Sequence, residues 1–308
     1  MYRAKDFIET RQGLMFAVVA EGLEAGRIRC FLRYVSQQGH WRKLGTHAAN
    51  QFLAEHYPQY LFTSAQLDAD LHAVPEADVL QHHLPQQRLQ QLLDAEPEDA
   101  VIADLQLLCQ LLQDDGANLE QVGVTGSILP GLQRHDSDID LVCYNRSHFQ
   151  QIRNRVQALI ARNKFQALQD EDWLAAFQRR ACELSLDEYI WHEQRKFNKA
   201  MVNQRKFDLS LVTPPRHADT SVFSKLGKIV LDVEVANDEF AFDYPAAYPL
   251  HHPEIAEAVS FTATYIGQAQ AGEWVKIAGL LEVDQQGVKR IVVGSDREAL
   301  GEYIRVIR

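Results

Sequence analysis

Three aspartates occur at alternate positions where an apolar run begins, in GVTGSILPGLQRHDSDIDLVCY (residues 123–144). A carboxylate at the mouth of a buried strand is costly unless it is paired, hydrogen-bonded or bound to a metal ion. Strand alternation places Asp138 and Asp140 on one face, while Asp136 is expected in the entering turn as a solvated residue. Two carboxylates on one face can share divalent cations, and Mg²⁺ prefers such hard oxygen ligands. The spacing therefore indicates a metal site.

A glycine and a serine, Gly126 and Ser127, end the apolar run that comes before these aspartates. The following ILPGL (residues 128–132) is expected to begin a short helix, because a first helical turn tolerates Pro130. Such a corner exposes backbone N–H groups, the glycine leaves room for a phosphate, and the serine adds a hydroxyl. The segment therefore predicts a phosphate-binding corner beside the carboxylate pair.

A third carboxylate lies on a later segment, KFDLSLV (residues 206–212), in which apolar and polar residues alternate. The alternation predicts a strand with Lys206 and Asp208 on its polar face. If this strand neighbours the first one, Asp208 could bind a metal ion or act as a base toward an acceptor hydroxyl. Two cations held ~3.5–4 Å apart stabilise both the attacking and the leaving oxygen of a phosphoryl transfer. Metal-dependent phosphoryl transfer is the chemistry that these residues suggest.

The Gly-Ser pair, a gap of ten residues, the Asp-Ile-Asp triplet and the later carboxylate together resemble the DNA polymerase beta superfamily of nucleotidyltransferases. The surrounding GSILPGL…SDIDLV is similar to its longer archaeal-type predicted members, whose substrates are unassigned. The resemblance covers roughly residues 95–215. Minimal members usually read Ala-Arg-Gly after the serine, whereas this chain reads ILPG, which keeps Gly131 and has no arginine.

The resemblance implies a role for each group of residues. The serine corner would hold the triphosphate, the paired aspartates would bind two Mg²⁺ ions, with Mn²⁺ as a possible substitute, and the third carboxylate would assist the incoming hydroxyl. The predicted catalytic and metal-binding residues are Asp138, Asp140 and Asp208. The predicted nucleotide-binding residues are Gly126, Ser127, Gly131 and, from its place beside Asp208, Lys206.

Composition limits the class of protein. The 308 residues suffice for two or three domains, and 46% apolar residues are ample for packed cores. The net charge of −11 argues against a surface coated with nucleic acid, so a polyanionic ligand must be met locally. The four cysteines have no close pairs, which favours buried, reduced thiols. No apolar run is long enough for a membrane span and no signal peptide is evident, so we expect a cytoplasmic protein.

Three regions are expected to position the candidate site in an α+β fold. Residues 1–94 should form an N-terminal β-meander followed by short helices. Residues 95–215 should form the catalytic domain, with the mixed-sheet, polymerase-beta-like nucleotidyltransferase core that the resemblance implies. Residues 216–308, with several β-runs punctuated by glycines, should form a small β-barrel-like domain.

Helical spacing is expected in several segments. The short N-terminal helices include SAQLDADLHAV (residues 64–74) and QQRLQQLLDA (residues 86–95). A longer helix is expected from a first turn at Pro97 to a stop at Gly116. Another should begin at Ser147, and the stretch from residue 170 to residue 202 should form a helix in two pieces.

Other residues allow two interpretations each. A basic cluster before Asp208 could meet triphosphate or an RNA backbone, or form a solvated helix face; it consists of Arg195, Lys196, Lys199, Arg205 and Lys206. Two histidine pairs lack the spacing of a zinc site and are expected to be exposed; they are His82–His83 and His251–His252. Three alternating aromatics could stack bases or fill a core; they are Phe240, Phe242 and Tyr244.

These observations predict a Mg²⁺-dependent enzyme that transfers a nucleoside monophosphate from an NTP, such as ATP, to an acceptor hydroxyl with release of pyrophosphate. The acceptor could be an RNA end, a protein side chain or a small molecule. The alternative is a non-catalytic nucleotide- or RNA-binding regulator that retains the fold. A third possibility is a partner-dependent enzyme that modifies Ser, Thr or Tyr hydroxyls of proteins.

Overall fold

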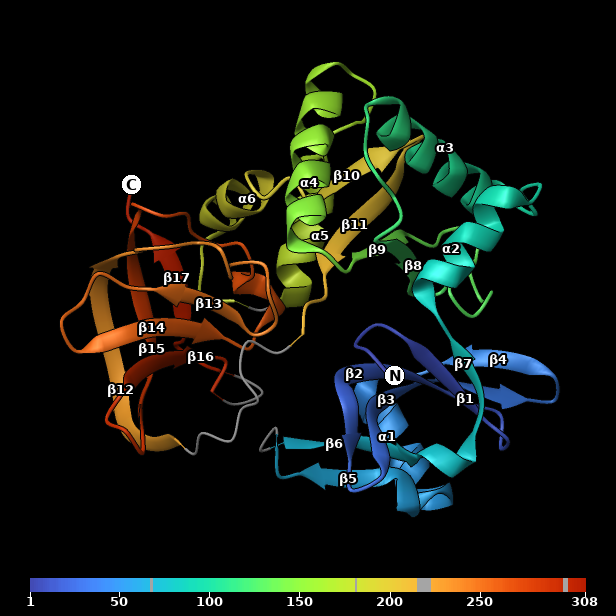
Figure 1. Ribbon diagram of the computed structural model, residues 1–308, viewed down its shortest axis with the longest axis horizontal. Coiled ribbons are helices and arrows are strands. Elements are labelled where there is room, and N and C mark those ends of the chain that lie inside the picture. The colour runs from blue at the N-terminus through green and yellow to red at the C-terminus, as the bar shows by residue number, and fades with distance from the viewer. Residues whose placement is uncertain (67–68, 181, 215–222, 296–298) are drawn as a thin grey trace. The chain divides into compact units, whose positions relative to one another are not determined.

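The computed structural model (Figure 1) describes residues 1–66, 69–180, 182–214, 223–295 and 299–308. It has the mixed α+β class that was predicted, with several sheets and, in the described ranges, six α-helices. The chain forms two compact units. Unit 1 consists of Met1–His148 and Val202–Asp219, and unit 2 of Phe149–Met201 and Thr220–Arg308. None of the described helices is long and apolar enough to cross a membrane.

The first sheet of unit 1 follows the order β5-β6-β3-β2-β1-β7, with β4 paired to β3, and its neighbouring strands are antiparallel. Its strands are β1 (Phe7–Thr10), β2 (Leu14–Glu24), β3 (Arg27–Gln37), β4 (His40–Lys43), β5 (Leu61–Ser64), β6 (Ala69–Pro75) and β7 (Val79–His83). The helices around it are α1 (Thr46–His56) and two short 3₁₀ turns, η1 (Pro58–Tyr60) and η2 (Glu76–Asp78). The predicted N-terminal antiparallel sheet is therefore confirmed.

The helix predicted over residues 64–74 is wrong, because most of that segment belongs to β6. His72 and Val74 pair with Cys30 and Ile28 of β3. The imidazole of His72 also accepts a hydrogen bond from the backbone N–H of Leu32 at 2.8 Å. Pairing and burial in the sheet outweigh the helix preference of the alanine and leucine residues in this segment.

The two faces of this sheet carry different residues because side chains alternate along each strand. One face includes Ile8 and Phe16 and packs against Leu53 of α1. The other face includes Phe7, Met15 and Tyr34. These residues form a cluster with Leu129, which lies in the corner just after Gly126 and Ser127. The second face is thus the one that meets the candidate site.

The second sheet of unit 1 is mixed. Its strands β8 (Val122–Thr125) and β9 (Ile139–Cys143) are antiparallel, whereas β9 and β11 (Arg205–Leu211) are parallel. Helix α2 (Pro85–Asp94) lies directly on β8, and Figure 1 shows the two together. A Cβ on Gly123 would come within 2.6 Å of Pro85, so the absence of a side chain permits this contact.

Helix α3 (Ala100–Asp114) begins three residues later than the predicted first turn at Pro97. Asp99 is its N-cap, and the carboxylate accepts a hydrogen bond from the N–H of Ile102 at 2.8 Å. The predicted stop is confirmed: the helix ends just before Gly116, which has a φ of +86°.

In its described residues, unit 2 holds three α-helices, one short 3₁₀ turn and the last sheet of the chain. The two-piece helix predicted over residues 170–202 is seen as α5 and α6, but it ends at Gln194, and the last part of that stretch is wrong because Lys199–Val202 form strand β10. Helix α4 begins one residue before Ser147. The helices are α4 (Arg146–Ala161), α5 (Asp170–Arg180), α6 (Leu186–Gln194) and the 3₁₀ turn η3 (Ala263–Tyr265). Strand β10 (Lys199–Val202), at the unit boundary, is the edge strand next to β11 in the sheet of order β10-β11-β9-β8. The strands of the last sheet are β12 (Phe223–Glu234), β13 (Ala246–Pro249), β14 (Ile255–Ser260), β15 (Trp274–Asp284), β16 (Lys289–Val293) and β17 (Tyr303–Val306). The last sheet has the order β12-β15-β16-β14-β13, with β17 paired to β15.

Candidate active site

The second sheet of unit 1 brings two of the predicted carboxylates together. Asp140 of β9 is in register with Asp208 of β11, its parallel neighbour, and with Thr125 of β8 on the other side. Residues in register on adjacent strands point to the same face of the sheet. Asp138 is exposed and lies just before β9, while Asp136 is exposed in the preceding turn, as predicted. The row from Thr125 through Asp140 to Asp208 is the centre of the candidate site.

Asp140 is partly buried, and its surroundings disfavour its charged form. Its pKa is raised to about 6, first by burial and then by the negative charge of Asp208, with a smaller contribution from Asp138. The positive charges of Lys5 and Lys43 act in the opposite direction. Carboxylates that repel one another in this way are a favourable environment for a cation, whose charge would remove the repulsion.

Gly126 lies directly against the carboxyl group of Asp140. Its φ is +65°, and a Cβ built on it would come within 2.1 Å of Oδ2 of Asp140. Both the left-handed backbone and the lack of space require glycine at this position. The sequence predicts that the missing side chain leaves room for a phosphate. In the structure, the Asp140 carboxyl group lies against this space.

The corner after β8 is a single turn, so the predicted short helix at residues 128–132 is wrong. The N–H of Leu132 donates to the carbonyl of Ser127 at 2.8 Å, and the N–H of Gly131 donates to that of Ile128 at 3.1 Å. With Gly131 at a φ of +71°, this is the hydrogen-bond pattern that ends helices. Pro130 cannot donate a hydrogen bond, and the turn stops as soon as it has formed.

Ser127 is held toward the loop that leads to Asp138. Its hydroxyl donates to Oγ of Ser137 at 3.1 Å, and that same oxygen accepts the N–H of Arg134 at 2.9 Å. The hydroxyl is partly exposed and can reorient toward a ligand at the cost of one neutral hydrogen bond.

A buried ion pair fixes the other side of this loop, and the sequence did not identify it. Arg205 donates through Nε to Oδ2 of Asp104 in α3 at 2.7 Å. Its Nη1 donates to the carbonyls of His135, at 3.0 Å, and Ser137, at 2.8 Å. Arg205 therefore positions the residues immediately before Asp138. A carboxylate among the apolar residues of α3 was the available signal for this contact.

The carboxylates do not form a finished metal site. Within the residues that the structure describes, no three His, Cys, Asp or Glu side chains converge closely enough to hold a metal ion as they stand. The chemistry of the donors nevertheless suits a hard divalent cation, because all three predicted ligands are carboxylates and the charges of two of them already oppose ionisation of Asp140. The group fits the residues if Asp138, which is exposed, turns toward the other two.

Comparison with known proteins gives one full-length relationship. No protein-family model matches the chain, and no solved structure matches it. The "Uncharacterized protein MJ1086" of Methanocaldococcus jannaschii is 32% identical over an alignment of 338 residues, which covers 99% of this chain and 99% of the relative. The chain belongs to the MJ1086 family. Because the alignment spans nearly all of both proteins, the family includes both units and not the candidate site alone.

The other predicted binding residues of this MJ1086-family chain lie near the same row. Lys206 is partly buried in β11, two positions before Asp208, and shares its face by strand alternation. Gly131 is exposed, and a Cβ there would meet only the guanidinium of Arg88, at 3.8 Å. Its requirement for glycine is thus one of backbone conformation.

Most of the predicted basic cluster is occupied by internal ion pairs rather than presented to a ligand. Lys196 and Lys199 both bond Glu193, and Lys196 is buried. Arg195 forms a bidentate pair with Glu273. Together with the Arg205–Asp104 pair, these contacts overturn the expectation that the cluster as a whole meets triphosphate or RNA.

One further expectation changes in the MJ1086-family chain, and two others hold. The first histidine pair is partly buried in β7: His82 bonds Asp6 at 2.8 Å and His83 lies 3.8 Å from Glu9. Phe242 packs inside unit 2, where its ring lies 5.1 Å from that of Phe149. The core-filling interpretation therefore holds for Phe242. All four cysteines are free thiols, as predicted, and three of them are buried.

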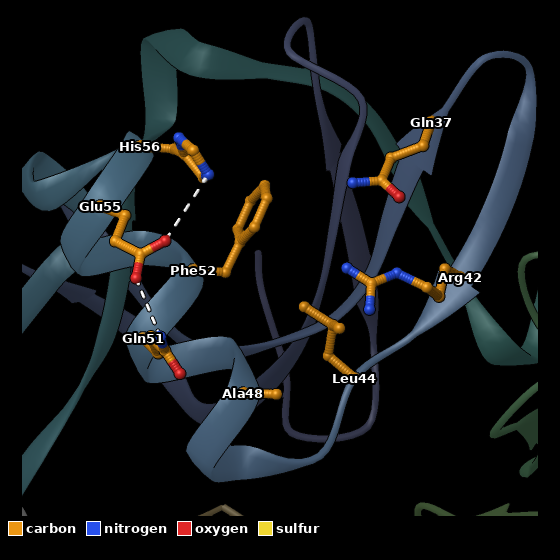
Figure 2. A pocket seen from close by; sticks show the side chains of 8 residues that line it. All are labelled: Gln37, Arg42, Leu44, Ala48, Gln51, Phe52, Glu55 and His56. Carbon is orange, nitrogen blue, oxygen red and sulfur yellow. Dashed lines mark hydrogen bonds and ion pairs between the residues drawn. The ribbon is translucent and has the colours of Figure 1, made fainter.

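A pocket on the opposite face of the N-terminal sheet is separate from these residues. Figure 2 shows its lining, which comes from the end of β3, from β4, from the link between β4 and α1, and from α1 itself. Arg42 reaches it from β4, and strand alternation directs the adjacent Lys43 to the other face. Along α1, Gln51 donates to Glu55 at 2.9 Å. None of the predicted site residues lines this pocket.

Proposed function

We propose that this protein is a metal-dependent nucleotidyltransferase that moves a nucleoside monophosphate from an NTP to an acceptor hydroxyl. The observation that carries the proposal is the registered pair Asp140 and Asp208, set against Gly126 and beside Asp138. Carboxylates on adjacent strands next to a glycine-serine corner are suited to hold a divalent cation and a phosphate chain together.

In this proposal Asp138, Asp140 and Asp208 would hold Mg²⁺, which supplies Lewis acidity at the phosphoryl oxygens when bound. Ser127 would donate a hydrogen bond to the phosphate chain. Asp208 would accept the proton of the acceptor hydroxyl while the oxygen of that hydroxyl forms the new bond to the α-phosphorus. The bond between the α-phosphorus and the bridging oxygen breaks, and pyrophosphate leaves.

The proposal also interprets the fold and the location. The sheet of β8, β9 and β11 would be the polymerase-beta-like nucleotidyltransferase core, residues 95–215 its domain, and the last sheet a small barrel-like domain. The enzyme would use the NTP pool of the cytoplasm, with an RNA end, a protein side chain or a small molecule as acceptor.

The test is calorimetric titration of each NTP, with and without Mg²⁺, into the wild type and the Asp138→Asn, Asp140→Asn double variant. We expect metal-dependent binding that is lost in the double variant. The matched control is Asp136→Asn, in the same loop, whose carboxylate forms an exposed pair with Arg134 at 3.8 Å. Binding that ignores both the metal and the double substitution overturns the proposal.

A second candidate is a non-catalytic nucleotide- or RNA-binding regulator. It is favoured by the lack of a preformed three-carboxylate cluster among the described residues. A pyrophosphate-release assay with RNA, protein and small-molecule hydroxyls separates the two. Nucleotide binding with no pyrophosphate released in any mixture would favour the regulator.

A further inference from the structure

The carboxylate row faces the N-terminal sheet, which was given no role by the sequence. The hydroxyl of Thr125, in register with Asp140, donates to the backbone carbonyl of Lys5 at 2.7 Å. Leu129, in the corner, packs against Phe7 and Tyr34 on the same face of that sheet. Two independent contacts thus fix the N-terminal sheet over the candidate site.

Two exposed lysines, Lys5 and Lys43, lie near these contacts. Lys5 lies in the turn just before β1, and its carbonyl accepts the hydrogen bond from Thr125, the residue in register with Asp140. Lys43 of β4 is in register with Tyr34 of β3. The charges of both lysines act on Asp140, and the charge of Asp140 in turn adds to the effect of burial in raising the pKa of Tyr34. The charges of both lysines therefore reach the candidate site.

The backbone of Lys5 is held in an unusual conformation. Its φ is +77°, in the left-handed region that non-glycine residues rarely adopt. Its N–H donates to the carbonyl of Val18 at 3.0 Å, and its own carbonyl accepts the Thr125 hydroxyl. Such strained positions persist when the surroundings over-determine them, and they cluster at ligand sites.

Neither lysine forms an ion pair with another residue in the described part of the chain. Among the residues that the structure describes, the ammonium groups of Lys5 and Lys43 have no carboxylate partner, and both side chains are exposed. This distinguishes them from Lys196, Lys199 and Arg205, whose charges are paired. Two available cations beside a carboxylate cluster suit a ligand that carries both a divalent cation and several negative charges.

We propose that Lys5 and Lys43 bind the β- and γ-phosphates of the nucleotide, so that the N-terminal sheet forms the wall that receives the leaving pyrophosphate. The inference rests on the proposed function. The polyphosphate tail is favoured over an RNA backbone because the face of the sheet that carries Lys43 packs on Leu129, two residues after Ser127.

The test compares Lys5→Met and Lys43→Met with Arg42→Met. Arg42 precedes Lys43 on β4 but faces the pocket of Figure 2, so it changes the same charge on the opposite face. We expect each lysine variant to weaken binding of the Mg²⁺–NTP complex about tenfold, as loss of a charge-assisted hydrogen bond does. Binding of the matching NMP should be unchanged, Lys43→Arg should retain affinity, and Arg42→Met should bind like the wild type.

Each result can be interpreted separately from the proposed function. If Asp138→Asn, Asp140→Asn abolishes NTP binding but both lysine variants bind normally, the wall is wrong and the metal site stands. If the wild type shows no metal-dependent NTP binding, the proposed function fails, and inorganic tripolyphosphate without metal then tests the lysines alone. Loss of tripolyphosphate binding in the lysine variants supports the wall. A selective loss of affinity for a short single-stranded RNA, with NTP and tripolyphosphate binding intact, overturns it. Thermal unfolding of each variant shows that it is folded.

Discussion

At the scale of single residues, the closest constraint is between Gly126 and Asp140. Two requirements coincide at this glycine: a left-handed backbone and the absence of a Cβ where the Asp140 carboxyl group lies. Gly131, five residues later, has a similar φ, but a Cβ there would make only an ordinary contact with Arg88 at 3.8 Å. The pair allows the conformational cost to be separated from the steric one.

We predict that Gly126→Ala lowers the free energy of unfolding by about 2–3 kcal/mol, of which ~1–2 kcal/mol is the cost of a left-handed alanine. It should also weaken Mn²⁺ binding, measured by calorimetry, because Asp140 must move. Gly131→Ala should show the conformational cost alone and bind Mn²⁺ normally. Equal effects of the two substitutions on Mn²⁺ affinity would contradict the assignment.

His72 should make stability depend on pH. Its Nδ1 accepts the N–H of Leu32 and its Nε2 lies 2.8 Å from Oδ1 of Asn50, which fixes the neutral form with the proton on Nε2. Burial lowers its pKa from 6.5 to about 4. Because the folded pKa is below the unfolded one, this contribution to stability is complete above pH 6.5 and is lost as the pH falls toward 4.

We expect His72 to account for a decrease of up to about 3 kcal/mol in the free energy of unfolding across that interval. Urea denaturation at several pH values would measure it, with His72→Asn as the comparison. The variant should be less stable at neutral pH and should depend less on pH. Parallel pH profiles for the two proteins would show that His72 does not titrate in this way.

At the scale of elements, the ion pair between α3 and β11 decides where the loop before Asp138 lies. Asp104 and Arg205 have side chains 12% and 13% exposed, so loss of one partner leaves a largely buried charge. We predict that Arg205→Met lowers the free energy of unfolding by ~3–5 kcal/mol. Hydrogen exchange should become faster at the amides of residues 134–138.

The matched control is Lys289→Met, which removes one partner of the exposed Lys289–Glu254 pair at 2.7 Å. Exposed pairs contribute little, and we expect no measurable change in stability. Similar losses for Arg205→Met and Lys289→Met would mean that burial does not decide the effect.

The sequence predicted elements whose signals are local and missed those that tertiary contacts decide. Alternation was sufficient for β9 and β11, and a glycine after an apolar stripe located the end of α3. The sequence alone could not show that the segment around His72 would pair with β3. It also could not show that Gly131 would end the turn that begins at Ser127 before a helix formed. Asp138, Asp140 and Asp208 were identifiable because carboxylates on a strand, or at its mouth, are costly unless they have a partner. Lys5, Lys43 and the Asp104–Arg205 pair depend on which segments meet in space, and no spacing along the chain reveals that.

At the scale of the whole molecule, all the predicted site residues belong to unit 1, while unit 2 has a buried charge cluster of its own. Burial alone would raise the pKa of Glu193, but the charges of Lys196 and Lys199 outweigh it and lower the pKa to about 2. We predict that Glu193→Gln, which leaves Lys196 buried without its counter-charge, lowers the free energy of unfolding by ~3–5 kcal/mol.

The tryptophans allow this loss to be observed in unit 2, because Trp173, Trp191 and Trp274 belong to it and Trp41 belongs to unit 1. In a Trp41→Phe background, all remaining tryptophans lie in unit 2. Urea denaturation followed by fluorescence, with and without Glu193→Gln in this background, would measure the loss of stability. Mn²⁺ affinity should be unchanged in the folded variant. A folded Glu193→Gln protein that no longer binds Mn²⁺ would show that the site depends on unit 2.

The path of the chain between the two units has a consequence during synthesis. Asp140 belongs to the first stretch of unit 1, but Asp208 belongs to a stretch made only after residues 149–201, which are part of unit 2. At ~5–20 residues per second, the ribosome needs several seconds to pass from one carboxylate to the other. A nascent chain released before β11 has the glycine corner and Asp140 but lacks the strand that borders them. The carboxylate pair is therefore a late product of translation, and it exists only in chains that have already made the first part of unit 2.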